Sequence, residues 1–250
     1  MGCGVNMSSQ DIIAISSFNR RSFFVACMKC LTEVRGHSDW RVIVHDDAST
    51  EYDVHDLLGD YYPHAEAIRH ERTLGCDKNN VQLLKAACGS GAKRVLMLDS
   101  DLILATDALE FADRVFSRTD GVLSLFNSNL HKVDDEFCPE LVTKSTIGSA
   151  GVLWEVDFLK GLLAELDDAA HFDWKLSDAV RARGKKICVA KESRVQHIGI
   201  VGEHSNGLKG YDWGVGFRVE TVAQGRAIAM IHGTQRRRPS KWQRLRRLFG

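Results

Sequence analysis

Two carboxylates stand two residues apart at the end of a strongly apolar stretch of the chain. Asp99 and Asp101 flank a serine and follow residues 94–98, which read Arg-Val-Leu-Met-Leu. Carboxylates at this spacing form a hard-oxygen site that suits Mg²⁺ or Mn²⁺. A metal ion held there can bridge a diphosphate and neutralise charge on a leaving phosphate. Acid-x-acid patterns also occur in solvated turns, so the place of this pair in the fold decides its role.

Polar residues also follow two earlier apolar stretches. Residues 12–16 lead into Ser-Ser-Phe-Asn-Arg at 16–20, and residues 41–45 lead into two aspartates at 46 and 47. In open α/β sheets, ligands bind beyond the carboxyl ends of the strands. Three polar strand ends on one edge of one sheet therefore indicate a ligand site.

The elements that must position these residues alternate along the first half of the chain. We predict strands at residues 12–16, 41–45, 65–69, 94–98 and 122–126, and helices at 22–34, 54–58, 81–87 and 108–116. This alternation is typical of an α/β fold with a mostly parallel central sheet flanked by helices.

The second half has a different pattern. Residues 127–150 are loop-rich and polar, and we predict helices at 156–166 and 174–183 with a short strand at 186–189. Six glycines in residues 199–216 indicate a lid-like segment. We therefore divide the chain into a flexible leader (1–10), a first half that carries the polar strand ends (11–126), a loop-rich second half (127–235) and a basic tail (236–250).

Composition excludes several classes of protein. The chain has 250 residues, of which 44% are hydrophobic and 26% charged, so it is neither disordered nor fibrous. No apolar run approaches the roughly 18 residues that a membrane span needs. The number of cysteines is odd, at seven, and no secretory signal precedes the first strand, so we predict reduced thiols and a cytoplasmic location.

The net charge of zero hides an asymmetry. Residues 236–250 contain seven basic and no acidic residues, which leaves 26 basic against 33 acidic residues in the rest of the chain. An acidic body argues against nucleic acid as a partner. The tail has the pattern of a basic amphipathic helix, which predicts peripheral contact with an anionic membrane surface. Contact with the acidic body or a partner, and a solvated tail, are the alternatives.

Taken in order, these motifs resemble a known family. Residues 16–20, 45–50 and 98–101 look like the nucleotide-sugar half of GT-A glycosyltransferases, most of all the inverting family 2 type. The usual forms are a Thr/Ser-Ser-Tyr-Asn-Arg loop, an Asp-Asp-Gly-Ser-Thr loop and an Asp-x-Asp metal motif. Here Phe18 stands at the tyrosine and Ala48 at the glycine.

Two later segments also match the family's pattern. Residues 172–176 resemble the start of the helix that carries the catalytic aspartate, and this register places Asp173 at the catalytic position, with Asp178 as the alternative. Residues 195–199 resemble the segment whose histidine completes the metal site, here His197. The resemblance covers about residues 11–200.

The resemblance implies a role for each matched residue. Asp101 would ligate Mn²⁺ or Mg²⁺ directly, Asp99 would be shared between the metal and the ribose, and His197 would supply a ring nitrogen. Asp173 would be the general base that takes the proton of the acceptor hydroxyl.

The nucleotide would contact residues from three segments. Ser16 and Phe18 would line the base pocket, and the Asp47 carboxylate would accept a hydrogen bond from the imide N–H of uracil. Lys78 is a candidate contact for the diphosphate or the base, and the alternative is an exposed helix start.

Aromatic and small residues mark the expected acceptor side. Trp154, Trp174 and Trp213 could stack on sugar rings, or they could pack in the core. Residues 149–152 are small and resemble the stretch where donor sugar and acceptor meet.

We therefore predict a metal-dependent glycosyltransferase that moves a sugar from a nucleotide-diphosphate donor, most simply a UDP-sugar, to a hydroxyl of a glycan, lipid-linked or protein acceptor, with inversion. A retaining GT-A enzyme and a catalytically inactive GT-A-like scaffold are the alternatives. A nucleotidyltransferase would need a Gly-rich loop after the first strand, and a dinucleotide oxidoreductase would need G-x-G-x-x-G there; the sequence has neither.

Overall fold

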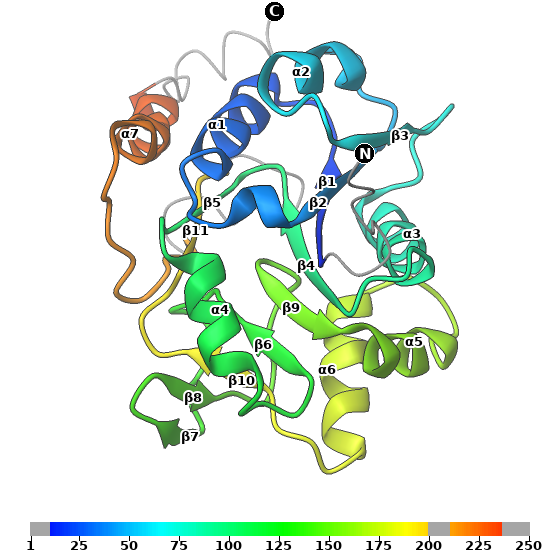
Figure 1. Cartoon of the computed structure of the whole chain (residues 1–250), viewed down its shortest axis with the longest axis vertical. Coiled ribbons are helices and arrows are strands. Elements are labelled where there is room, and N and C mark those ends of the chain that lie inside the picture. Colours follow the sequence, from blue (N-terminus) through cyan, green and yellow to red (C-terminus); the bar gives the residue numbers. More distant parts are fainter. Residues whose placement is uncertain (1–10, 200–210, 237–250) are drawn as a thin grey trace, which may run out of the picture.

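The computed structural model describes residues 11–199 and 211–236, and the predicted leader, most of the lid-like segment and nearly all of the basic tail lie outside these residues. A nine-stranded sheet in the order β3-β2-β1-β4-β9-β6-β10-β8-β7 runs through the molecule (Figure 1). A second sheet pairs β5 with β11. Both halves of the chain therefore contribute strands to one sheet, and the predicted α/β class is confirmed.

The first half of the sheet is parallel, as predicted. Strands β1 to β4 are Ile12–Ser17, Arg41–Asp46, Glu66–Arg69 and Arg94–Asp99. Strand β1 lies between β2 and β4, in a register that pairs Ser16 with both His45 and Asp99. The polar strand ends thus lie at one edge, because parallel strands present all their carboxyl ends in the same direction.

Helices cover both faces of the sheet, because alternate residues of each buried strand point to opposite sides. Ile13 and Ile15 of β1 pack toward α1, α2 and α4, whereas Ile12 and Ala14 pack toward α3, α5 and α6. The helices are α1 Arg21–Leu31, α2 Val54–Tyr61, α3 Cys76–Gly89, α4 Ala108–Phe116, α5 Val156–Ala164 and α6 Phe172–Ala182, with a 3₁₀ turn at His37–Asp39.

The second half of the sheet is mostly antiparallel, and its strand order differs from the chain order. Strand β9 (Val152–Glu155) lies antiparallel between β4 and β6 (Val122–Ser124). Strand β10 (Cys188–Ala190) then pairs parallel to β6 and antiparallel to β8. We predict a strand at residues 122–126, and the structure has β6 there. In the sheet, however, β6 does not lie next to β4, because β9 from later in the chain lies between them.

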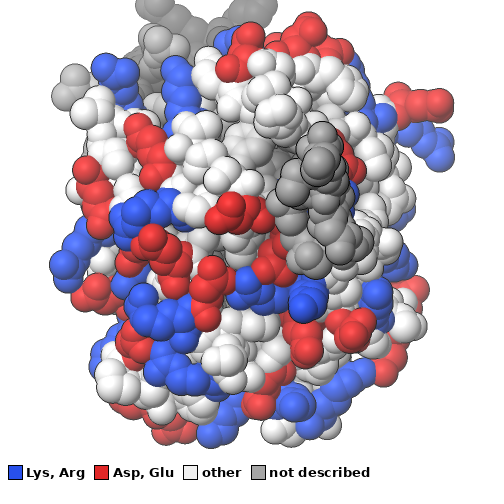
Figure 2. Space-filling model, viewed as in Figure 1, with Lys and Arg blue, Asp and Glu red and all other residues white. Residues whose placement is uncertain are grey.

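A short hairpin lies in the region that we predicted as loop-rich. Strands β7 (Asp135–Cys138) and β8 (Leu141–Thr143) form the far edge of the sheet. The sequence pattern misses them because each has only three or four residues and β7 is largely exposed. On the face shown in Figure 2, acidic and basic side chains are mixed over this part of the molecule.

The separate two-stranded sheet joins distant parts of the chain. Strand β5 (Leu102–Leu104) begins directly after Asp101 and pairs antiparallel with β11 (Val195–His197), so that Leu102 lies opposite His197. Neither strand was predicted, because each is only three residues long. Their pairing carries a residue from late in the chain to the carboxyl end of β4.

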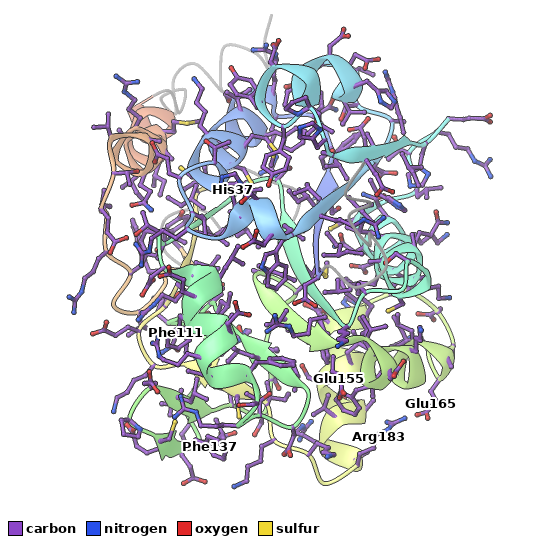
Figure 3. The ribbon with its side chains drawn as sticks, viewed as in Figure 1. His37, Phe111, Phe137, Glu155, Glu165 and Arg183 are labelled. Carbon is purple, nitrogen blue, oxygen red and sulfur yellow. The ribbon has the colours of Figure 1, made fainter. Side chains whose placement is uncertain are left out.

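The last described helix, α7 (Val222–Arg236), packs on α1. Ala227 and Ile231 of α7 share a buried cluster with Phe23 and Cys30 of α1. On the opposite side of the molecule, α5 and α6 are tied by an ion pair between Glu165 and Arg183 (Figure 3). Within the described residues, no helix has the length and apolar character that crossing a bilayer requires.

The three tryptophans of the expected acceptor side have different environments. Trp154 lies at the centre of β9 and is 4% exposed, opposite Val95 and Val122, so it is a core residue. Trp174 and Trp213 are 58% and 38% exposed. Only these two can therefore present a ring to a ligand.

We expect Trp154→Ala to lower the free energy of unfolding by about 3–5 kcal/mol, because it removes a large buried ring from the sheet centre. Trp174→Ala is the matched control, and its effect should stay within about 0.5 kcal/mol. Urea unfolding followed by circular dichroism measures both. Equal stabilities of the two variants would contradict the placement of Trp154 in the core.

Candidate active site

At the carboxyl edge of the parallel strands, one buried carboxylate is paired with two cationic side chains. Asp101 is 3% exposed and follows β4 by two residues. Its Oδ2 lies 2.8 Å from Nη1 of Arg20 and 3.1 Å from Nε2 of His197. Burial by itself raises the pKa of a carboxyl group, but here the charges and hydrogen bonds of His197 and Arg20 outweigh it and hold the Asp101 pKa well below its usual range.

The neighbouring carboxylate has the opposite shift. Burial, with the negative charge of Asp101, raises the pKa of Asp99 to about 6. Nothing in the described residues donates a hydrogen bond to the Asp99 side chain at normal distance, so its negative charge is poorly compensated. Two adjacent carboxylates with opposite shifts indicate a site that can accept further positive charge.

His197 is held by its neighbours in β11 and the segment that follows. Burial lowers the pKa of the imidazole, yet the charge and hydrogen bond of Asp101 raise it above the ordinary value overall. The ring stacks on Tyr211 with centroids 6.3 Å apart, and the Tyr211 hydroxyl donates to the His197 carbonyl oxygen. A Cβ at Gly199 would overlap the Asp101 carboxylate, so this close approach requires glycine.

Arg20 reaches Asp101 through an unusual backbone. Asn19 and Arg20 both have left-handed conformations, with φ of 49° and 54°. Asn19 tolerates this region better than most residues, and its side-chain oxygen accepts from the backbone N–H of Thr50 and Glu51. Its own N–H donates to Ser49 Oγ at 2.7 Å. Such strain persists only where the surroundings enforce it, and it is common at functional sites.

Arg20 belongs to the Ser-Ser-Phe-Asn-Arg motif, but the sequence alone gives this residue no role. Two consecutive left-handed residues are visible only in the structure, and so is the contact with Asp101. Tyr211 was missed for the same reason: its position in the chain gives no sign that it stacks on His197.

The residues that we predict to contact the nucleotide lie near the ends of β1 and β2 and the start of α3. Ser16 is 8% exposed, and its Oγ accepts a hydrogen bond from Asn79 Nδ2 at 2.9 Å. The same Asn79 nitrogen donates to the His45 carbonyl oxygen at 3.1 Å. Phe18 is 43% exposed, so its ring is available to a ligand. Asn79 thereby ties α3 to both strand ends.

The two aspartates at the end of β2 hold the surrounding loops. Both oxygens of the Asp47 carboxylate accept backbone hydrogen bonds, from Leu74 at 2.6 Å and Gly75 at 3.0 Å. Asp46 is fully buried and accepts from Ser17 Oγ. Ala48 has a φ of 60°, a conformation that explains why glycine is the usual residue of this motif.

Lys78 lies in the first turn of α3, where its side chain is exposed and close in the chain to Gly75, the residue held by Asp47. The same turn presents Cys76, which is exposed.

Asp173 begins α6 at the same edge. Its Oδ1 accepts from the backbone N–H of Trp174 at 2.9 Å, which leaves Oδ2 facing Gly148, where an added Cβ would lie 3.9 Å away. The side chain is half-buried, and burial raises its pKa. Asp178, the alternative, is exposed and paired with Arg181 in the next turn. A carboxylate with a raised pKa and a free oxygen suits general base chemistry.

The residues at this edge match a divalent-cation site in chemistry but not in arrangement. The described residues contain no group of three or more His, Cys, Asp or Glu side chains arranged as metal ligands. Asp101 is instead paired with Arg20 and His197. The donor set of two carboxylates and one imidazole nevertheless has the chemistry of a Mn²⁺ or Mg²⁺ site.

Comparison with known proteins supports the resemblance. The family model described as glycosyl transferase family 2 matches residues 12–128, which contain the three strand-end motifs. Comparison with curated proteins gives no match.

Solved structures of S. aureus TarS residues 1–349 share the fold. The complex with UDP-GlcNAc has a TM-score of 0.61 and 18% identity, over 78% of this chain and 60% of that one. The complex with UDP has a TM-score of 0.57 and 16% identity, over 74% and 59%. This chain thus spans about three fifths of the TarS chains, and the likeness confirms the GT-A fold.

Removing Arg20 tests its role in stabilising the buried carboxylate. We expect Arg20→Ala to lower the free energy of unfolding by about 2 kcal/mol at pH 7, since a charged hydrogen bond is lost. The depressed folded-state pKa of Asp101 stabilises the folded protein above the unfolded value near 3.9, and this effect is lost only as pH falls toward the folded-state pKa. The difference between wild type and variant should therefore stay large at pH 4 and shrink only at much lower pH.

The exposed neighbour Arg21 provides the control for urea unfolding at pH 7 and at about pH 2. Arg21→Ala should change stability by less than about 0.5 kcal/mol at both values. A variant of Arg20 as stable as that control at pH 7 would contradict the assigned charge pairing.

Proposed function

We propose that this chain, whose residues 12–128 match glycosyl transferase family 2, transfers a sugar from a UDP-sugar to a hydroxyl acceptor, with inversion and with a divalent cation. Residues 11–126 would form the donor half and residues 127–235 the acceptor half. The single observation that carries the proposal is the gathering of Asp99, Asp101 and Asp173 at the carboxyl edge of the sheet, with His197 and Arg20 on Asp101.

The donor half would bind the nucleotide at the ends of β1, β2 and β4. Ser16 and the exposed ring of Phe18 would line the base pocket. Each Asp47 oxygen accepts one backbone N–H and keeps a further lone pair, so Asp47 can accept the imide N–H of uracil while holding the loop at Leu74. Lys78, at the start of α3, can approach the diphosphate.

The cation would be held by Asp99, Asp101 and His197, and it would supply charge neutralisation for the leaving diphosphate. In the structure Arg20 supplies positive charge to the same Asp101 oxygen. Arg20 can therefore steady this carboxylate before the cation binds and turn toward an anionic ligand afterwards.

The reaction would use Asp173 as its base. The acceptor hydroxyl attacks the anomeric carbon, the bond from that carbon to the diphosphate oxygen breaks, and the hydroxyl proton passes to Asp173 Oδ2. Oδ1 cannot serve equally well because it accepts from the Trp174 N–H. The exposed rings of Trp174 and Trp213 can position the acceptor sugar.

The membrane contact expected for residues 236–250 stays a prediction, because only the first of these residues lies within the described part of the chain. Binding of the full chain to anionic vesicles would test it separately from the transferase reaction.

Nucleotide binding tests the donor half. In calorimetric titrations of UDP, GDP, CDP and dTDP with and without Mn²⁺, we expect UDP to bind most tightly and only with Mn²⁺. Asp101→Ala should abolish this binding, because it removes the metal ligand and leaves Arg20 and His197 without their shared carboxylate. A folded wild-type protein that binds none of the nucleotides would overturn the proposal.

A second test concerns the base. Asp173→Asn should lower kcat by about 10²–10⁴-fold and leave UDP affinity unchanged, because only proton transfer is removed. The matched control, Asp178→Asn, should keep full activity.

The pH profile of the wild type gives the direction of the Asp173 shift. The raised pKa keeps the Asp173 carboxyl group protonated to a higher pH, and a protonated carboxyl group cannot act as a base. As pH is lowered, activity should therefore be lost at a higher pH than it would be with an ordinary carboxyl group. NMR of the product anomer would show whether the configuration inverts; retention would contradict the direct-displacement role of Asp173.

A further inference from the structure

A small pocket beside Asp173 has no role in the reaction described above. It has a volume of about 30 Å³, which is room for one or two water-sized groups. Three ionisable side chains line it, Lys144, His131 and Asp212, together with Gly148 and Ser128. It lies in the acceptor half of the chain and was not expected from the sequence.

The pocket contains a buried cation with few partners. Lys144 is 3% exposed, and its ammonium group donates to the Ser128 carbonyl oxygen at 2.7 Å. An ammonium group has three donors, and the described residues provide neither a second hydrogen bond nor an ion pair within 4.0 Å for the other two. Burying a charge without such partners is costly unless a ligand or water satisfies it. In keeping with this, burial lowers the Lys144 pKa to about 8.

The acceptor groups of the pocket are fixed in advance. The Ser128 hydroxyl donates to the Asp212 carboxylate, and Ser128 pairs with Gly214 in an isolated β-bridge. Two flanking hydrogen bonds, from Asn129 N to the Trp213 carbonyl and from Trp213 N to Asn129 Oδ1, hold the two segments together. Ser128 therefore orients both the ammonium group and the carboxylate.

Gly148 connects this pocket to the proposed base. It lines the pocket, and its position brings it close to Asp173 Oδ2, as the 3.9 Å spacing from an added Cβ indicates. The charge of Asp173 also acts on His131, whose pKa is lowered by burial first of all. A group bound in the pocket would thus lie beside the hydroxyl that Asp173 deprotonates.

The charges of the pocket favour a neutral ligand. Lys144 offers donors, Asp212 offers acceptor lone pairs, and their opposite charges balance. A hydroxyl group both donates and accepts, so it can bond to each of them. A phosphate or carboxylate would gain from Lys144 but would face the Asp212 carboxylate, and the pocket is too small for more than one or two water-sized groups.

We propose that Lys144 and Asp212 form an acceptor subsite that binds a non-reacting hydroxyl of a sugar or polyol acceptor, next to the hydroxyl that is glycosylated. This inference rests on the proposed transferase function, because it names the acceptor chemistry of the same site. Lys144 thereby becomes a residue that determines which hydroxyl of the acceptor reaches Asp173.

Ligand-observed NMR with the full chain tests the subsite. The probes are methyl β-D-glucopyranoside and methyl N-acetyl-β-D-glucosaminide as neutral ligands, and methyl β-D-glucuronide and inorganic phosphate as anions, each with and without UDP. The variants are Lys144→Met and Asp212→Asn. The control is Lys93→Met, which makes the same change at an exposed position. Lys93 directly precedes β4, at the end of this strand away from Asp99.

We expect at least one neutral glycoside to bind wild type and the control alike, and to bind about tenfold or more weakly to Lys144→Met, since a hydrogen bond to a charged group is lost. Asp212→Asn should also weaken it, and this variant keeps the test valid if Lys144→Met does not fold. UDP affinity should be unchanged in both variants.

Three results would overturn the subsite. These are equal glycoside affinity in wild type and both folded variants, no binding of either neutral glycoside by a protein that binds UDP, and a preference for glucuronide or phosphate that Lys144→Met abolishes. Failure of the wild type to bind UDP would instead contradict the proposed function, and it is read separately from the glycoside signal.

Discussion

The site depends on keeping the Asp101 carboxylate charged while it is almost completely buried. A lone carboxylate in that environment would take up a proton, since desolvation disfavours the charged form. Arg20 and His197 prevent this by meeting the same oxygen from two sides. Much of the surrounding structure serves this contact, including the left-handed backbone of Asn19 and Arg20 and the pairing of β11 with β5.

One edge of the sheet holds carboxylates in very different states. Asp101 has two cationic partners and a depressed pKa, Asp99 has a raised one, and Asp173 is half-buried with one oxygen committed to a backbone N–H. Environments that push similar groups apart in pKa are what allow them to take different roles in a reaction. In the proposed function the first two would bind a cation and the third would accept a proton.

The proposed acceptor side is built differently from the proposed donor side. Parallel strands place the proposed donor residues at their ends, whereas the pocket of Lys144 and Asp212 is formed by segments that are joined at Ser128. Buried Trp154 and exposed Trp174 illustrate the same division. One belongs to the sheet that both halves share, and the other is available to a ligand.

The sequence by itself determined the α/β class, the parallel strands β1 to β4 and the polar residues at their ends, because periodicity and strand-end chemistry are local properties. It also indicated Asp173 at the start of α6. Only the tertiary structure decided that β9 lies between β4 and β6, that Arg20 contacts Asp101, that Trp154 is buried, and that the Lys144 ammonium group has one hydrogen-bond acceptor among the described residues. Each of these depends on which distant segments come together, and that is settled by packing of the whole chain and not by any short pattern.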